Sequence, residues 1–316
     1  MRVFGSIDEA SGSAGLAPGA ALAIGNFDGV HLGHRALLAE ALRLARAQGT
    51  PAAALTFEPH PGKLLGPKVA PRLLTTPARK LELLAEAGLD AVVVQPFDAA
   101  FAAVSAEAFV QGLLLGGLRV GAVVVGEDFS FGQGRRGRAE QLRAWLPAGG
   151  ARLSLVPKVE LDGAPVSSTR VRELVLEGRV AQAARMLARP FDVDGRVVTG
   201  MGRGRGLGFP TANVLPDAEL LPANGVYAVR ARGTFGELPG AANLGRKPTF
   251  GEDAGQTLEI HLIGFAGKES LVGQPMRVAF LERLRDEQRF PSVEALAAQI
   301  GRDVALAARI GNAPGR

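Results

Sequence analysis

Two of the four histidines in this chain lie three positions apart, within residues 25–34. An apolar run, 21–24, precedes this segment and a helical pattern comes after it, so we expect a strand, a tight turn and a helix. A helix N-terminus offers unpaired N–H groups and the positive end of a dipole. His31 and His34 would share one face of the first turn. There they could bind phosphate oxygens and stabilise charge on a transferring phosphoryl group.

Two other interpretations of this histidine pair are a capping turn with surface histidines and a metal site. A third histidine, His60, follows the apolar run 52–57 and should reach the same edge of the sheet. A zinc site needs about three or four protein ligands, and no further ligands occur at standard spacing. The strand–turn–helix context therefore favours a phosphate site.

Two further polar segments follow predicted strands and should reach that edge as well. One, GEDFSFG, contains Asp128. The other places Ser168, Thr169 and Arg172 at the start of a predicted helix. Hydroxyl and guanidinium groups there can bind an anion as well as cap the helix. Taken alone, a serine or threonine at such a position is more often only a cap.

A glycine-rich segment marks the second half of the chain, with five glycines among the nine residues 200–208. Such a loop presents bare N–H groups and can wrap phosphates, although a flexible hairpin loop has the same composition. Thr211 and Asn213 come next, two apart on a predicted strand, so their side chains share a face. A hydroxyl and an amide carbonyl are oxygen ligands that suit magnesium.

Glu259 lies between Leu258 and Ile260 in strand-like alternation, so its side chain points opposite to theirs. A surface salt bridge is the default interpretation for such a glutamate. His261 shares the face of Glu259, and we expect it to be structural.

The elements that must position the first-half residues alternate between apolar runs and helical stretches. Continuous apolar strands separated by helices indicate a buried parallel sheet. The predicted fold class is therefore α/β and doubly wound, with ligands bound at the carboxyl ends of the strands. The predicted strands are 21–24, 52–57, 91–94, 122–125 and 153–156, and the predicted helices are 31–48, 76–87, 105–115 and 138–146.

The pattern of apolar residues changes after Pro190, which follows a predicted helical stretch at 168–188. Strand-like runs between Gly- and Pro-rich turns predict an antiparallel β unit such as a small barrel. A terminal helix begins at Ser292, a good N-cap, and one apolar face should pack on the barrel. We predict two domains, 1–186 and 187–316. The predicted strands are 193–199, 226–232, 241–244, 258–263 and 276–284, and the apolar helix face consists of Val293, Leu296, Ala297, Ile300 and Val304.

Composition excludes several classes of protein. The chain has no cysteine, which rules out disulfides and zinc–cysteine sites and suits a reducing cytoplasm. No apolar run approaches the ~20 residues needed to span a bilayer, so we expect no membrane partner. The formal net charge is +5, but the arginines are scattered without a long basic run, so we expect no nucleic-acid partner.

The motifs occur in a specific order: GNFDGVHLGH, FEPHP, GEDFSFG and SSTRVR, then the glycine-rich loop with PTAN, then LEIHL and LRDEQRF. From about residue 20 to 312 the chain resembles the bacterial bifunctional riboflavin kinase/FAD synthetases. The HxGH element alone indicates only the wider nucleotidylyltransferase group, whereas the ordered set is much more specific. The resemblance implies that riboflavin is phosphorylated to FMN and that FMN is adenylylated to FAD. ATP would be the co-substrate of both reactions, with Mg²⁺ as cofactor.

The resemblance also implies roles for matching residues of the first half. His31 and His34 would be catalytic and contact the ATP phosphates. Other ATP contacts would come from Gly25, Phe27, Asp28, Gly33, Ser168, Thr169 and Arg172. The flavin side would include Phe57, His60 and Asp128, the last facing the flavin phosphate and magnesium.

For the second half, the resemblance implies a Greek-key barrel with Glu259 as the general base of a kinase. Arg285 and Glu287 would lie on the flavin side. ATP would contact Gly202, Arg203, Gly204, Gly208, Thr211 and Asn213, the last two also holding magnesium.

Two rival hypotheses remain open. The chain could be a nucleotidylyltransferase for another phosphate ester, with a β domain that only binds ligand, or a flavin- or nucleotide-binding module without catalysis. Glu259 with Thr211 and Asn213 discriminates against both, because neither needs a base beside a magnesium site. The chain departs modestly from the family's sequence pattern, at Ala188, Phe191 and Arg138.

Overall fold

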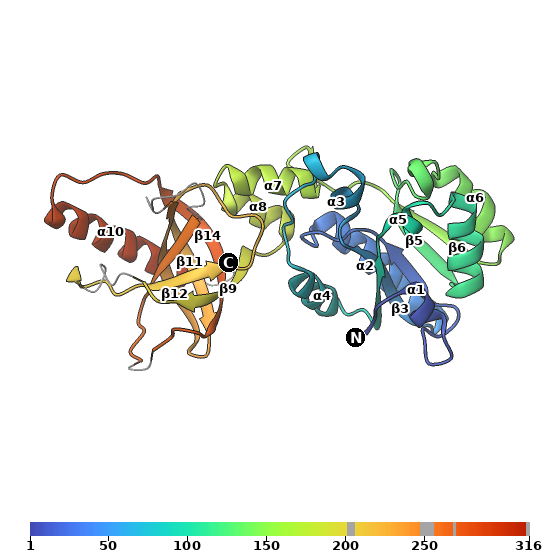
Figure 1. The fold of residues 1–316 in the computed structure, drawn as a ribbon, viewed down its shortest axis with the longest axis horizontal. Coiled ribbons are helices and arrows are strands. Elements are labelled where there is room, and N and C mark those ends of the chain that lie inside the picture. The colour runs from blue at the N-terminus through green and yellow to red at the C-terminus, as the bar shows by residue number, and fades with distance from the viewer. Residues whose placement is uncertain (201–205, 247–255, 268–269, 314–316) are drawn as a thin grey trace. The chain divides into compact units, whose positions relative to one another are not determined.

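The structure, a computed structural model, describes residues 1–200, 206–246, 256–267 and 270–313. The chain divides into two compact units, Met1–Ser167 and Ser168–Arg316, and each is described by itself (Figure 1). In the described part of the chain, no helix is long and apolar enough to cross a membrane.

A six-stranded parallel sheet of order β1-β4-β3-β2-β5-β6 forms the centre of the first unit. The chain moves outward from β2 through β3 to β4 and then returns to β5 and β6, so the order reverses between β2 and β5. Open α/β sheets bind ligands at the carboxyl ends of the strands beside such a reversal. The strands are β1 (Arg2–Phe4), β2 (Ala21–Ile24), β3 (Ala52–Glu58), β4 (Ala91–Pro96), β5 (Ala122–Gly126) and β6 (Arg152–Val156).

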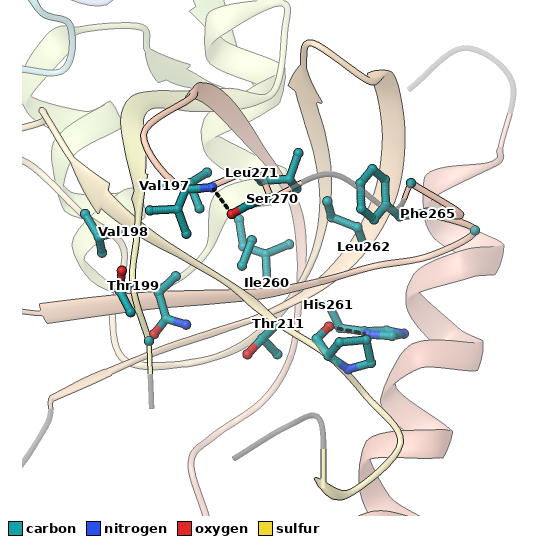
Figure 2. A pocket seen from close by; sticks show the side chains of 17 residues that line it. Val197, Val198, Thr199, Thr211, Ile260, His261, Leu262, Phe265, Ser270 and Leu271 are labelled. Atoms are coloured by element: carbon teal, nitrogen blue, oxygen red, sulfur yellow. Dashed lines mark hydrogen bonds between the residues drawn. The ribbon is translucent and has the colours of Figure 1, made fainter. Parts of the chain in front are cut away.

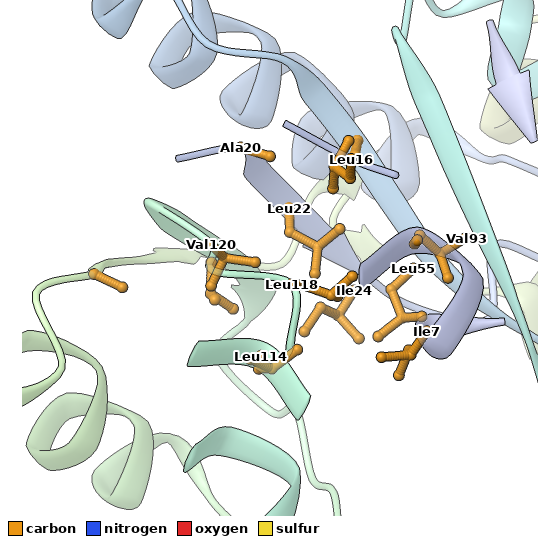
Figure 3. Close-up of a cluster of buried hydrophobic side chains, with 14 of the residues drawn as sticks. Ile7, Leu16, Ala20, Leu22, Ile24, Leu55, Val93, Leu114, Leu118 and Val120 are labelled. Carbon is orange, nitrogen blue, oxygen red and sulfur yellow. The ribbon is translucent and has the colours of Figure 1, made fainter. Parts of the chain in front are cut away.

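Helices cover both faces of this sheet, which confirms the predicted doubly wound fold. On one face, Leu22 and Ile24 of β2 pack against residues of α1, η2 and α6 (Figure 3). On the other face, Ala21 and Ala23 of the same strand pack with residues of α2 and α4. Both faces of β2 are buried, and this explains its uninterrupted apolar run.

The remaining elements of this unit are short except for α2. They are α1 (Ile7–Ser11), α2 (Leu32–Gln48), α3 (Pro61–Leu65), the 3₁₀ helix η1 (Pro67–Val69), α4 (Pro77–Glu86), α5 (Ala99–Ala102), the π-helix η2 (Ala108–Gly117), the 3₁₀ helix η3 (Gln133–Arg135), α6 (Ala139–Ala148) and the hairpin of β7 (Glu160–Leu161) and β8 (Ala164–Pro165).

The second unit contains a closed six-stranded antiparallel barrel of order β10-β13-β12-β11-β14-β9. Strands β11, β12 and β13 are joined consecutively, and β14 returns to lie beside β11. This spatial order, fourth-first-second-third, is the Greek key, as predicted. The strands are β9 (Phe191–Val198), β10 (Ala212–Pro216), β11 (Gly225–Gly233), β12 (Gly236–Arg246), β13 (Gln256–Leu262) and β14 (Pro275–Arg285).

Helices α7 (Ser168–Leu176) and α8 (Val180–Leu187) precede the barrel, and α8 packs against β14 and β9. Gly178 in the turn between them has φ +76°, and a Cβ there would lie 2.8 Å from Arg283 Cδ and 2.9 Å from the Tyr227 hydroxyl. This glycine therefore lets the α7–α8 turn approach the barrel closely.

The terminal helix α10 (Val293–Gly311) packs on β11, β12 and β14. Of the predicted apolar face, Leu296, Ala297, Ile300 and Val304 are half-buried, whereas Val293 is 61% exposed. The fully buried residues, Asp303, Ala307 and Gly311, continue the same side of the helix toward its C-terminus. An ion pair from Asp303 to Arg285 on β14, with Nη2 and Oδ2 2.8 Å apart, turns a polar residue toward the barrel, and apolar periodicity alone could not predict this.

Candidate functional site

His31 is the N-cap of α2, and its orientation defines the first candidate site. Its Nδ1 accepts a hydrogen bond from the backbone N–H of His34, with 3.3 Å between the nitrogens. In a neutral imidazole one nitrogen accepts and the other carries the proton, so the proton of neutral His31 lies on Nε2. Capping thus leaves His31 with an Nε2–H donor at a helix N-terminus, where an anion is favoured.

The ring of His34 stacks on that of His31, with centroids 3.7 Å apart and planes 17° apart. Gly33 permits this arrangement, because a Cβ there would lie 3.1 Å from His31 Cε1. The structure therefore brings together His31, His34 and Gly33, as their spacing predicted.

The turn before α2 holds two non-glycine residues with positive φ, Phe27 at 51° and Val30 at 42°. Bulky and β-branched residues adopt this backbone only when the surroundings hold it, and both side chains are fully buried. The Phe27 ring packs on Gly25 and meets His34 edge to face at 5.3 Å. Phe27, expected to contact ATP, is thus a core residue that supports His34.

Asp28 is also expected to contact ATP, but its carboxylate binds the protein's own backbone. It is 4% exposed and accepts hydrogen bonds from the N–H groups of Leu74 and Thr75 at 2.9 and 3.1 Å. The Thr75 hydroxyl lies 3.2 Å from the same carboxylate and 3.2 Å from the N–H of Gly29. Asp28 therefore ties the turn to the segment before α4. Thr75 was missed, since no motif distinguishes it.

His60 lies at the carboxyl end of β3, beside the same turn. Its Nδ1 accepts from the N–H of Gly62 at 3.0 Å and so caps α3. Asn26 Nδ2 and His60 Nε2 are 3.2 Å apart, while the backbone carbonyl of Asn26 accepts from the Thr56 hydroxyl at 3.1 Å. The predicted proximity of His60 to the histidine turn is therefore seen, and Asn26 is the residue that links them.

Six phenylalanines form a connected aromatic cluster near the carboxyl ends of β3, β4 and β5. Neighbouring ring centroids lie 5.6 to 6.3 Å apart. Two of the rings are buried and the others are half-buried, so the cluster presents aromatic surface. Only the first of them was predicted as a site residue. The residues are Phe57, Phe97, Phe101, Phe109, Phe129 and Phe131.

Asp128 follows β5, whereas the other predicted anion-binding residues begin α7. The side chain of Asp128 is 68% exposed and pairs with Lys158, with 3.1 Å between the charged atoms; such an exposed pair contributes little stability. Ser168, Thr169 and Arg172 lie in the first turns of α7, in the second compact unit.

A row of polar residues crosses three strands of the barrel in the second unit. Glu259 on β13 lies directly opposite Asn213 on β10 and opposite Asn243 on β12. Directly opposed residues point to the same face, with Cβ atoms about 5 Å apart. Along β13, Leu258 and Ile260 are fully buried whereas Glu259 is half-buried, which confirms the predicted alternation.

A cavity of about 720 Å³ opens beside this row, between the ends of β9, β10 and β13 and the loop after β13 (Figure 2). Thr211 and Asn213 both line it, as does His261. Gly200 also lines it, and a Cβ there would lie 2.0 Å from Asn213 Nδ2, so glycine is required at that position. Glu259 does not line the cavity, but Asn213 belongs to both features.

The two residues expected on the flavin side differ in their contacts. Glu287 lies over Gly245, where a Cβ would come 2.2 Å from Glu287 Oε1. The Glu287 carboxylate therefore lies against β12 at Gly245, two residues after Asn243. The guanidinium of Arg285 instead binds Asp303 on α10, with 3.0 Å from Nε to Oδ2. Arg285 therefore anchors the terminal helix.

The glycine-rich segment is only partly described. Gly202, Arg203 and Gly204 lie outside the described residues, whereas Gly208 has φ +83°. Within the described ranges, no group of three or more His, Cys, Asp or Glu side chains could hold a metal ion. The oxygen donors of Thr211 and Asn213 fit magnesium, which commonly takes few protein ligands and completes its shell with phosphates and water.

The first unit has a parallel sheet with a histidine pair at a helix N-terminus, and the second has a barrel with a carboxylate beside oxygen donors. Together these features define a two-domain transferase that uses nucleotides. The chain matches the FAD synthetase family over residues 15–170 and the riboflavin kinase family over residues 187–310.

Curated relatives match this chain over most of its length. The bifunctional riboflavin kinase/FMN adenylyltransferase of Escherichia coli strain K12 is 43% identical over 289 residues, which cover 90% of each chain. That of Pseudomonas fluorescens is 40% identical over 92% of each chain. A solved structure described as a macrolide-efflux protein from Streptococcus pneumoniae superposes with a TM-score of 0.86, at 28% identity over 98% of this chain and 99% of its own. The chain therefore belongs to the family of bifunctional riboflavin kinases/FMN adenylyltransferases.

Proposed function

We propose that this chain phosphorylates riboflavin to FMN in its barrel and adenylylates FMN to FAD in its α/β unit. The observation that carries the proposal is the register that sets Glu259 opposite Asn213, next to a cavity lined by Thr211. A carboxylate placed beside magnesium ligands is the arrangement that a kinase needs, and neither a pure adenylyltransferase nor a binding module needs it.

In the kinase reaction, Glu259 takes the proton of the ribityl hydroxyl as that oxygen attacks the γ-phosphorus of ATP. The new O–P bond forms as the bond to the β-phosphate oxygen breaks, so FMN and ADP are the products. Thr211 and Asn213 would hold Mg²⁺, which would neutralise charge on the phosphates. Glu287, which follows β14 and places its carboxylate over Gly245 of β12, borders the flavin side, and Arg285 contributes there by fixing α10. Gly202, Arg203, Gly204 and Gly208 supply the loop around the phosphates.

In the adenylyltransferase reaction, a phosphate oxygen of FMN attacks the α-phosphorus of ATP and pyrophosphate leaves. The His31 Nε2–H and the N–H groups at the start of α2 donate to the phosphate oxygens as charge develops. His34, held by stacking on His31 and by Phe27, adds a second imidazole to the same face. No base is needed, because the FMN phosphate is already ionised near neutral pH.

Other residues of the adenylyltransferase reaction act by contact or by position. Ser168, Thr169 and Arg172 bind the ATP phosphates as hydroxyl and guanidinium donors. Gly25 and Gly33 allow close approach of the backbone. Asp28 acts through the segment that it holds, at Leu74 and Thr75.

The aromatic cluster near the ends of β3, β4 and β5 is the surface proposed for the flavin ring system. Flat heteroaromatic rings stack favourably on phenylalanine, and Phe57 and Phe97 are half-buried members of the cluster. His60 contacts Asn26 of the histidine turn, and Asp128 would face the flavin phosphate and magnesium.

The proposed functional boundary lies between residues 186 and 187, although the compact units divide after Ser167. The family matches end at 170 and resume at 187, so α7 and α8 lie largely between them. The absence of cysteine in all 316 residues supports a cytoplasmic setting, where thiols stay reduced.

Incubating the pure protein with riboflavin, ATP and magnesium and separating the flavins over time tests the proposal. FMN should appear first and FAD second. Unchanged riboflavin would reject the kinase assignment, and accumulation of FMN without FAD would reject the adenylyltransferase assignment. Omitting magnesium should stop both steps.

A further inference from the structure

His261 makes a contact that the proposed kinase chemistry does not use. It lies on β13 two residues after Glu259, half-buried on the same outer face. Its Nδ1 is 2.9 Å from the backbone carbonyl oxygen of Pro210 (Figure 2). A carbonyl oxygen only accepts, so His261 must carry a proton on Nδ1 to make this bond.

A second contact holds the same segment. The ring of Phe209 meets the imidazole of His261 edge to face, with 5.5 Å between centroids. Gly301 of α10 faces that phenylalanine, since a Cβ there would lie 3.9 Å from Phe209 Cζ. Phe209 and Pro210 are therefore fixed against β13, with α10 close by.

The residue after Pro210 is Thr211, so these contacts bear on the position of its hydroxyl. The ladder between β10 and β13 begins at the pair of Ala212 and Ile260, one residue beyond Thr211. Thr211 itself lies outside strand β10 but lines the cavity with Asn213 and His261. A shift of Pro210 would move the Thr211 hydroxyl directly, whereas Asn213 is held by strand pairing.

We propose that His261 is a positioning residue of the riboflavin kinase reaction: by donating from Nδ1 to the Pro210 carbonyl, it fixes the Thr211 hydroxyl where magnesium-ATP binds. The inference rests on the proposed role of Thr211 as a magnesium ligand. His261 acts on the reaction through Pro210 and Thr211, so its loss weakens magnesium-ATP binding more than it slows the chemical step.

Three substitutions separate this role from simple packing. In His261→Asn the side-chain amide nitrogen takes nearly the place of Nδ1 and keeps the donor. In His261→Gln the donor is displaced toward the place of Nε2, and His261→Ala has none. We expect the KM for magnesium-ATP in FMN formation to rise roughly five- to tenfold in the Ala and Gln variants, the effect of one lost hydrogen bond. The Asn variant should stay within about twofold of the unaltered chain.

FAD formation from supplied FMN serves as the internal reference and should be unchanged in all three variants. A rise in KM that is equal in the Asn, Gln and Ala variants would overturn the proposal, as would unchanged kinase KM in the Ala variant. Absence of kinase activity in the unaltered chain would reject the proposed function itself, which is a different outcome.

The tautomer of His261 gives a test on chains in which His261 is intact. With four histidines in the chain, single substitutions of the other three assign the ¹⁵N signals of the His261 imidazole by elimination. The neutral ring of His261 should carry its proton on Nδ1, whereas that of His31 should carry it on Nε2. A proton on Nε2 of His261 would overturn the proposal even if the Ala variant failed to fold.

Discussion

One candidate phosphate site is built from a single short segment of the chain, whereas the other is built from segments that are distant in the sequence. In the first unit, the turn, the cap and both imidazoles lie within residues 25–34. A hydrogen bond from the His34 N–H to His31 Nδ1 leaves the proton of neutral His31 on Nε2, which is the proposed donor. In the second unit, Asn213, Asn243 and Glu259 come from three strands and meet only through barrel register. A local motif therefore specifies one site, whereas the closure of a whole barrel specifies the other.

This difference determines how amino-acid substitutions affect each site. A substitution in the turn changes a site whose backbone is held by nearby contacts, such as those of Asp28 to Leu74 and Thr75. In the barrel, any change that shifts strand register by one residue moves Glu259 to the other face. Because the two sites share no residue, single substitutions can break one and spare the other.

Glu259→Gln should have the largest effect. The amide keeps shape and hydrogen bonding but cannot accept the ribityl proton, so FMN formation should fall ~10²–10⁴-fold. FAD formation from supplied FMN should persist. The measurement is the rate of each reaction in the same preparation, by chromatography of the flavins.

The matched control for that variant is Glu237→Gln, on β12, which removes the ion pairs of Glu237 with Arg230 and Arg232 and should leave both rates unchanged. If both reactions fall equally in Glu259→Gln, Glu259 is structural. If neither falls, the base lies elsewhere.

His31→Ala and His31→Asn should each lower FAD formation by ~10²-fold or more, since both lack the Nε2–H donor. Asparagine still caps α2 through its side-chain oxygen, whereas alanine costs the helix about 1 kcal/mol. Thermal unfolding followed by the single tryptophan, Trp145 in the first unit, separates stability from catalysis. FAD synthesis at the normal rate in the Asn variant would mean that His31 is only a cap. FMN formation should stay intact in both.

The same contrast explains how far these sites could be predicted from the sequence. The histidine turn, the parallel sheet and the antiparallel β unit were predicted, because helix starts, apolar runs and strand alternation act over short distances. The Greek-key order of the barrel was implied only by the family resemblance. The contacts of Asp28 with Thr75 and of Arg285 with Asp303 were not predicted, because they join segments 47 and 18 residues apart. The short edge strand β1 was missed too, since three residues carry too little pattern.

Fragments test where the barrel unit begins. A fragment from residue 168 should be more stable than one from residue 187, because the shorter one lacks α8 and the burial of Val180, Ala183 and Met186. Their loss should cost on the order of 4 kcal/mol. Urea unfolding followed by circular dichroism measures the difference, and riboflavin phosphorylation reports function. Equal free energies of unfolding would show that residues 187–316 are a self-sufficient domain.

The smallest effect concerns the single tyrosine, Tyr227, inside the barrel. Burial, opposed by the charge of Arg283, raises its pKa to about 12 from 10.0. A raised pKa favours the protonated form in the folded state, so this stabilisation is complete below pH 10 and is lost as pH rises toward 12. Absorbance titration of the phenol measures it directly. A midpoint near pH 10 in the folded protein would show that the ring is not buried.

Mixing two variants tests the central claim, that one chain carries two separate sites acting in sequence. Given riboflavin, ATP and magnesium, Glu259→Gln alone should leave riboflavin unchanged, and His31→Ala alone should stop at FMN. The mixture should make FAD, because FMN released by the kinase site of one chain can enter the adenylyltransferase site of another. FAD made at the normal rate by either variant alone, or no FAD from the mixture, would contradict the account.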